Sequence, residues 1–219
     1  GVTNSNAPLT TVLMDQNRSV SPSFSENAYS LQVFAGFGGF ANGDGNFSHG
    51  ALANISATPD IGYSFSGWSG SGIDDNKSAA TTVLMDQAKT VSATFSLNSY
   101  SLSVQTGVGG SVSGDGNFSH GALANISATP DIGYSFSGWS GSGIDDNTSA
   151  ATTVLMDQTK TVGATFSLNS YPLSVLAGVG GTVSGDGNFS HGSLPIIRAT
   201  PDFGYLFYGW SGDGVTNPL

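Results

Sequence analysis

The sequence Tyr-Ser-Phe-Ser-Gly-Trp at residues 134–139 begins by alternating large aromatic residues with small polar ones. Because successive side chains of a β-strand lie on opposite faces of a sheet, Tyr134 and Phe136 share one face and Ser135 and Ser137 share the other. Aromatic side chains gathered on a single face can fill a hydrophobic core. This stretch therefore predicts a β-strand with one buried and one exposed face.

Similar patterns predict five more strands in the same part of the chain. Together the predicted strands cover residues 100–106, 110–113, 123–129, 134–139, 152–156 and 161–166. Turn residues separate them, as in Pro130-Asp131-Ile132-Gly133 and in the glycine-rich stretch 107–110. The sequence therefore predicts an all-β fold.

The whole chain repeats itself every 71 residues. Every tryptophan, methionine and histidine keeps this spacing, as do three of the tyrosines: Trp68, Trp139 and Trp210; Met14, Met85 and Met156; His49, His120 and His191; Tyr29, Tyr100 and Tyr171. Residues 44–100 and 115–171 differ at only three positions, which indicates duplication. A fixed period of this length predicts a tandem array of small β modules.

The period divides the chain into complete and partial repeats. We expect the C-terminal part of a repeat at 1–28, complete repeats at 29–99 and 100–170, and the N-terminal part of a repeat at 171–219. The last part is expected to form the first four strands of a repeat and to lack the final two. A copy of those two strands stands at the other end of the chain, in residues 10–25.

Packing alone must hold each repeat together, because the chain contains no cysteine and hence no disulfide. Aromatic residues make up 11% of the chain, and each buries roughly 150–250 Å² when it packs. We expect Trp68, Trp139 and Trp210 to lie in the cores of successive repeats.

The composition excludes several classes of partner. The net charge of −10 and a pI near 4.2 give the chain an acidic surface, which repels phosphate groups and anionic lipids, so we expect no nucleic-acid partner. No apolar run approaches the roughly 18 residues that a membrane-spanning helix needs, so we expect no membrane insertion.

Several motifs of the second repeat are similar to those of a known family. They are Tyr-Ser-Leu-Ser-Val at 100–104, Ala-Thr-Pro at 128–130, Gly-Tyr-Ser-Phe-Ser-Gly-Trp at 133–139, and Met-Asp-Gln-Thr-Lys-Thr-Val-Gly-Ala-Thr-Phe at 156–166. Together they resemble the divergent internalin-type B-repeat of bacterial surface proteins. The resemblance covers essentially the whole chain. It implies compact β modules, β-grasp-like or small sandwiches, strung in tandem along extracellular or cell-surface proteins as stalk or adhesive segments, and it brings no catalytic residue.

No group of catalytic side chains emerges from the residues themselves. One histidine per repeat lies in Asn-Phe-Ser-His-Gly, but nothing nearby supplies the partner that orients a general base. The sequence Gly138-Trp139-Ser140-Gly141 lacks the Gly-x-Ser-x-Gly spacing of many hydrolases. We expect that the chain is not an enzyme.

Asp-Gly-Asn triplets are the main candidates for a metal site. They match the start of a calcium-binding loop, but no bidentate glutamate follows them, and the same residues suit a tight turn. We therefore expect no cofactor, with Ca²⁺ as the alternative at Asp44 and Asn46, Asp115 and Asn117, and Asp186 and Asn188.

Apolar departures from the middle repeat mark candidate contact surfaces. The residues Phe34, Phe40, Ile196, Leu206 and Tyr208 stand where the second repeat has Gln105, Ser111, Asn125, Ser135 and Ser137. Strand alternation points Leu206 and Tyr208 away from the core. At the incomplete repeat we expect one of two outcomes: either Val12 and Phe24 of one chain complete it in the next chain, giving a head-to-tail filament, or a covalent continuation supplies its missing strands.

The sequence leaves three functions open. The leading one is a non-enzymatic structural repeat region of a bacterial extracellular or cell-surface protein, an adhesin stalk or a fibre whose partners are neighbouring repeats or chains of its own kind. The second is a carbohydrate-binding module that uses Tyr208 or a tryptophan as a platform for host or matrix glycans. The third is a domain appended to a secreted hydrolase.

Overall fold

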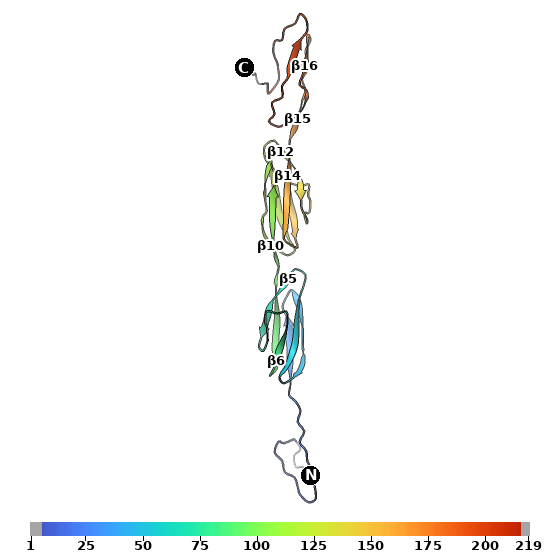
Figure 1. The fold of residues 1–219 in the computed structure, drawn as a ribbon, viewed down its shortest axis with the longest axis vertical. Helices are drawn as coiled ribbons and strands as arrows, with labels where there is room; N and C mark the ends of the chain where they lie inside the picture. The colour runs from blue at the N-terminus through green and yellow to red at the C-terminus, as the bar shows by residue number, and fades with distance from the viewer. Residues whose placement is uncertain (1–5, 216–219) are drawn as a thin grey trace. The chain divides into compact units, whose positions relative to one another are not determined.

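The computed structural model describes residues 6–215 of the chain (Figure 1). Across this range the strands are joined by turns and loops and no helix occurs, which confirms the all-β prediction. The same range accordingly offers no helix of the length and apolar character needed to cross a membrane. Two compact units, Gly1–Ser96 and Leu97–Leu219, are described in turn.

The first unit contains one complete repeat of seven strands. They are β1 (Ala28–Ala35), β2 (Gly39–Asn42), β3 (Gly45–Ser48), β4 (Ala51–Pro59), β5 (Tyr63–Gly70), β6 (Ala80–Met85) and β7 (Lys89–Leu97). One sheet has the order β3-β1-β7-β5, and the other has the order β2-β4-β6. Strands β1 and β7 run parallel, whereas β1 and β3, β2 and β4, and β4 and β6 are antiparallel.

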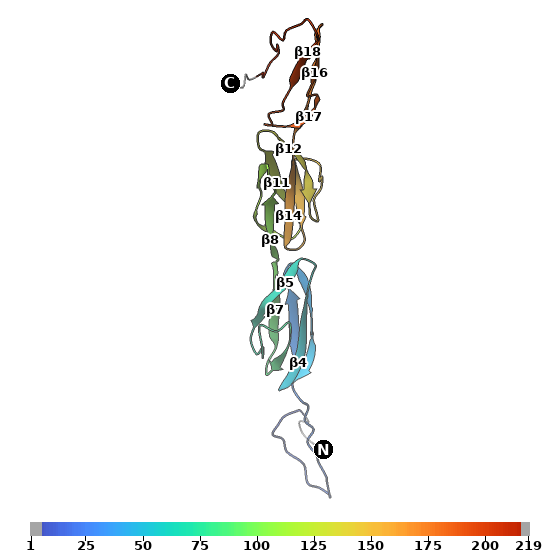
Figure 2. The same cartoon turned by 45° about the horizontal axis from the view of Figure 1, so that its top comes forward.

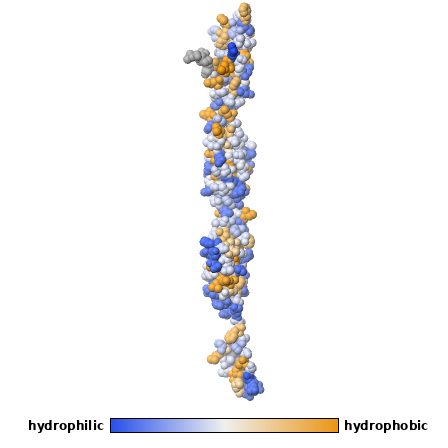
Figure 3. Space-filling model, viewed as in Figure 1, coloured by the Kyte–Doolittle hydropathy of each residue, from blue (hydrophilic) through white to orange (hydrophobic). Residues whose placement is uncertain are grey.

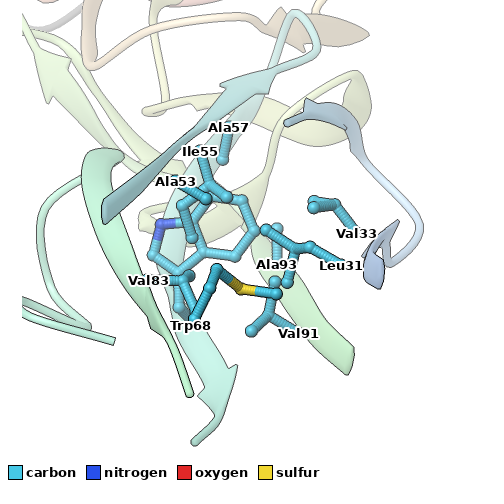
Figure 4. Close-up of a cluster of buried hydrophobic side chains, with 10 residues drawn as sticks. Leu31, Val33, Ala53, Ile55, Ala57, Trp68, Val83, Val91 and Ala93 are labelled. Carbon is cyan, nitrogen blue, oxygen red and sulfur yellow. The ribbon is translucent and has the colours of Figure 1, made fainter. Parts of the chain in front are cut away.

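Both sheets of the first repeat contribute to one core (Figure 4). Leu31 of β1 and Val91 of β7 are buried in the same cluster as Ile55 of β4 and Val83 of β6. Trp68 of β5 lies in this cluster with 5% of its surface exposed. Because a sheet lies on each side of this core, the small sandwich is the form of β module that the repeat adopts.

The second unit opens with a repeat of the same design (Figure 2). Its strands are β8 (Ser99–Thr106), β9 (Gly110–Ser113), β10 (Gly116–Ser119), β11 (Ala122–Pro130), β12 (Tyr134–Ser140), β13 (Ala151–Met156) and β14 (Lys160–Leu168). They form sheets of order β10-β8-β14-β12 and β13-β11-β9. A separate core of buried residues includes Leu102, Ile126, Trp139 and Val162. The near-identical sequences of the two complete repeats therefore give the same fold.

Close packing explains one glycine that recurs in every repeat. Gly109 has φ of +99°, a left-handed conformation that side chains disfavour. A Cβ atom there would lie 2.2 Å from the ring of Tyr134, which leaves no room for any side chain. Gly38 and Gly180 have similar backbone angles and the same contact with a tyrosine ring.

The described part of the third repeat has four strands and is partly irregular. Its strands are β15 (Ser170–Leu173), β16 (Gly181–Ser184), β17 (Gly187–Ser190) and β18 (Arg198–Pro201), which form two pairs, β15 with β17 and β16 with β18. The expected fourth strand, the counterpart of β12, does not form. Residues 205–211 are irregular instead. Trp210, expected in a core, is only half-buried. In the second repeat β12 pairs with β14, and residues 205–211 have no such partner strand among the described residues.

Candidate functional site

The first and last strands of each complete repeat lie side by side and run in the same direction. In the first repeat, parallel pairing extends from Leu31 opposite Lys89 to Ala35 opposite Ala93, and the amide of Gly36 adds a hydrogen bond of 2.9 Å to the Ala93 carbonyl. In the second repeat, the ladder of β8 and β14 has the same register, from Leu102 and Lys160 to Thr106 and Ala164. The chain therefore enters each repeat at one end of this ladder and leaves at the other. We call these two pairs the terminal ladders.

A buried lysine lies at the start of each terminal ladder. The Nζ atom of Lys160 donates to the Leu155 carbonyl at 2.6 Å and forms an ion pair with Asp157 at 2.8 Å, while only 4% of the lysine side chain is exposed. Its hydrogen bond to the carboxylate holds the pKa of Asp157 below its usual value. Gly143 makes room for the ammonium group, since a Cβ atom there would lie 2.2 Å from Nζ.

The first repeat has the same arrangement. Lys89 donates to the Leu84 carbonyl and pairs with Asp86 at the same two distances, 2.6 and 2.8 Å, and this contact lowers the pKa of Asp86. Sequence patterns alone indicate no role for these lysines. The signal that marks them is the Asp-Gln-x-Lys motif at the same place in both complete repeats.

The aspartates of the Asp-Gly-Asn triplets bond to the protein backbone. The Oδ1 atom of Asp115 accepts a hydrogen bond of 2.7 Å from the Val104 amide, next to the point where β8 changes partner from β10 to β14. Asp44 accepts likewise from Val33 at 2.6 Å, and Asp186 accepts from Val175 at 2.5 Å. The asparagines Asn46, Asn117 and Asn188 lie on exposed positions of β3, β10 and β17.

These contacts explain the triplets by backbone pairing. Among residues 6–215, no three histidine, aspartate or glutamate side chains form a group that could hold a metal ion. The candidate calcium ligands therefore do not come together with further carboxylates in the described part of the chain.

The tryptophans of the complete repeats are core residues in this structure. Trp68 and Trp139 are each 5% exposed. The indole N–H of Trp139 donates to the Ser149 carbonyl at 3.0 Å, and the indole N–H of Trp68 donates to the Ser78 carbonyl at 3.1 Å. Neither ring face is available as a platform for a sugar.

The candidate contact residues are mostly exposed. Phe34 on β1 and Phe40 on β2 are about half exposed, and Val12 is half-buried. Nearly full exposure is found for Phe24, Ile196, Leu206 and Tyr208. Apolar surface is visible over the third repeat, at the upper end of Figure 3. In the described part of the third repeat, Ile196, Leu206 and Tyr208 are thus exposed apolar side chains.

The family to which these repeats belong is shown by comparison with known proteins. Residues 29–99, 100–170 and 171–218 each match the divergent InlB B-repeat domain. The chain belongs to this family. The resemblance drawn from the sequence is thus confirmed. Searches of curated proteins and of solved structures gave no significant match.

Tandem B-repeats are typical of bacterial surface proteins. The chain is accordingly a B-repeat region of the kind found in surface proteins, and the family indicates an extracellular or cell-surface location. The terminal ladders are the feature of this B-repeat region that bears on its role.

Proposed function

We propose that this B-repeat region is a non-enzymatic structural segment of a bacterial surface protein, an adhesin stalk or a fibre that carries tension. The terminal ladder of each complete repeat is the observation on which this proposal depends.

The direction of the terminal strands decides how a repeat responds to tension. The chain enters β8 at Ser99 and leaves β14 at Leu168, and these two residues lie at opposite ends of a parallel ladder. A pull on the two ends of the repeat slides β8 along β14, so all the hydrogen bonds between them are loaded together. A ladder loaded from one end would instead lose its bonds one at a time. The observed geometry therefore favours resistance to tension along the chain.

Burial along the ladder supports the same role. Val104 and Val162 form a direct pair in the register of β8 and β14, and both are buried. At the first pair of the ladder, Lys160 bonds to the Leu155 carbonyl and to the Asp157 carboxylate. Sliding the strands exposes these groups to water, which opposes the movement.

The near identity of the complete repeats also suits a structural role. The duplicated segments differ at three positions, and none of the residues there is buried. Lys77 corresponds to Thr148, Ala88 to Thr159 and Ser92 to Gly163. The ten buried core residues are the same in both repeats, and the terminal ladder keeps its register although Phe34 and Ser92 of the first repeat are Gln105 and Gly163 in the second. A common core and a common register are what interchangeable mechanical units need.

Single-molecule pulling tests the proposal. The chain contains no cysteine, so pairs of introduced cysteines can define the points of attachment. Ser99→Cys with Leu168→Cys loads the ladder in shear. Val108→Cys with Leu168→Cys loads the ladder from one end, because both residues come after its last pair, Thr106 and Ala164.

We expect the shear geometry to require a clearly higher unfolding force than the end-loaded geometry. Complete unfolding in shear should release roughly 20 nm of chain. Equal forces in the two geometries would show that the ladder does not bear the load, and the proposal would then lose its support.

A further inference from the structure

A single residue joins the second repeat to the third. Strand β14 ends at Leu168 and strand β15 begins at Ser170, so only Asn169 lies between them. One residue spans at most about 3.5 Å of extended chain. The two repeats, which belong to the same compact unit, therefore approach each other closely on either side of Asn169.

Asn169 is bonded to the second repeat through its backbone and through its side chain. Its amide donates to the Gly133 carbonyl at 2.8 Å. This bond adds one step to the ladder of β12 and β14, whose outermost pair is Tyr134 and Leu168. The Oδ1 atom of Asn169 accepts a hydrogen bond of 2.6 Å from the Ser135 hydroxyl. The residue between the two repeats is thus held by β12 and by the turn before it.

The third repeat holds the same residue from the other side. The amide of His191, which follows β17 directly, donates to the Asn169 carbonyl at 2.8 Å. Strand β17 is paired with β15, the strand that Asn169 precedes. Backbone hydrogen bonds in both directions therefore connect Asn169 to the second repeat and to the β15–β17 pair of the third.

The imidazole ring of His191 packs on Gly133. A Cβ atom at Gly133 would collide with this ring. The glycine has φ of +85°, in the left-handed region that side chains disfavour, so the turn and the ring contact both require glycine. The same imidazole lies edge-on to the Tyr171 ring, with centroids 6.1 Å apart. We call Gly133, Ser135, Asn169 and His191 the joint residues.

The joint residues belong to the repeated unit. The half that the third repeat supplies is built in the same way in the second repeat, where the His120 amide donates to the Asn98 carbonyl at 2.8 Å and the imidazole lies edge-on to Tyr100. The half that the second repeat supplies, Gly-x-Ser at 133–135, recurs as Gly-x-Ser at 62–64. The joint is thus assembled from residues that recur with the 71-residue period.

From these contacts we infer that the turn before β12 and the β15–β17 pair are complementary interaction surfaces, which hold the second and third repeats in one fixed orientation. The partner that each surface fits is the neighbouring repeat. Two hydrogen bonds and one ring contact restrict the chain around Asn169, which a flexible linker would leave free.

The inference deepens the proposed stalk function, on which it rests for its biological use. A joint of this kind passes bending as well as tension from one repeat to the next. Ser135 and His191 keep exposed surface, so the contact is small and single substitutions should loosen it.

Pulsed EPR measurements of the distance between two spin labels test the inference with the 219-residue chain. The chain has no cysteine, so Ser111→Cys and Thr182→Cys place the labels at equivalent, exposed positions of β9 and β16. A fixed joint gives a narrow distribution of distances. Two variants alter the joint from opposite sides: His191→Ala removes the ring on the third repeat, and Ser135→Ala removes the hydroxyl on the second.

We expect each variant to broaden the distance distribution clearly. The matched controls are His49→Ala, at the same position of the first repeat, and Ser137→Ala, an exposed serine two residues further along β12. Both controls should leave the distribution unchanged. A broad distribution in the chain without a joint substitution, or one that neither His191→Ala nor Ser135→Ala changes, overturns the inference.

Amide hydrogen exchange gives a second readout at the joint itself. The Asn169 amide should exchange about fivefold faster in both variants, the value of roughly one hydrogen bond. The amides of β14 should keep their rates, which shows that the second repeat stays folded. An unchanged rate at Asn169 in both variants contradicts the inference. The pulling experiment loads only the second repeat, between Ser99 and Leu168, so failure of the joint and failure of the stalk proposal are distinguishable.

Discussion

Replacing Trp139 by alanine should remove most of the stability of the second repeat and leave the first repeat unchanged. The indole is 5% exposed and packs beside Phe136, with ring centroids 5.6 Å apart. Its N–H also donates to the Ser149 carbonyl. The two complete repeats have separate cores, so the damage should remain in one of them.

The expected magnitude follows from burial. A tryptophan that buries about 200 Å² contributes about 5 kcal/mol at 25 cal/mol per Å², and alanine retains only a small part of this. Substitutions of this kind measured in other cores cost about 3–5 kcal/mol. A unit of this size has a total stability of roughly 4–10 kcal/mol. The variant should therefore lose a large share of the stability of the second repeat, so that this repeat unfolds at a clearly lower urea concentration than the first.

Urea denaturation provides the measurement. In a Trp210→Phe background, the wild-type Trp68 and Trp139 should report a single common transition, because their repeats are nearly identical. In the Trp139→Ala variant, circular dichroism should show a new early transition, while Trp68 fluorescence keeps its midpoint. A loss of less than about 1 kcal/mol for the second repeat would refute the assignment of the indole to the core.

Three further outcomes are expected. The hydrogen bond from Lys160 lowers the pKa of Asp157. The stability that this ionised carboxylate contributes is therefore fully present above the unfolded-state pKa near 3.9, and it is lost as pH falls through the lower folded-state pKa. In thermal melts, the stability difference between wild type and Asp157→Asn should accordingly shrink below about pH 4. Asp115→Ala should cost about 1–3 kcal/mol by leaving the Val104 amide without its carboxylate acceptor, and a chelator should leave the wild-type melting temperature unchanged. Gly109→Ala should destabilise the second repeat by about 1–3 kcal/mol in urea denaturation. Residue 109 has a left-handed backbone conformation, and a Cβ atom there would collide with the Tyr134 ring. An unchanged urea midpoint would contradict the packing described.

The strand positions show how far sequence patterns reach. The strand expected at 134–139 is observed as β12, Tyr134–Ser140, and the one expected at 161–166 is observed as β14, Lys160–Leu168. Sequence patterns do not predict strand β10, Gly116–Ser119, because it is short and begins in a glycine-rich turn. It forms because β8 offers it a ladder, which is a property of the neighbouring strand and not of its own residues.

What the sequence determined by itself is the all-β class, the 71-residue period and the family, because alternation, turn residues and repeated motifs are local properties of the chain. The tertiary structure alone decided that β8 and β14 lie parallel and adjacent, since alternation is the same for either strand direction and any partner. It also decided that Lys160 is buried and that residues 205–211 are irregular. A lysine is buried, and an aromatic strand is ordered, only when segments distant in the sequence supply the acceptors and the ladder that they require.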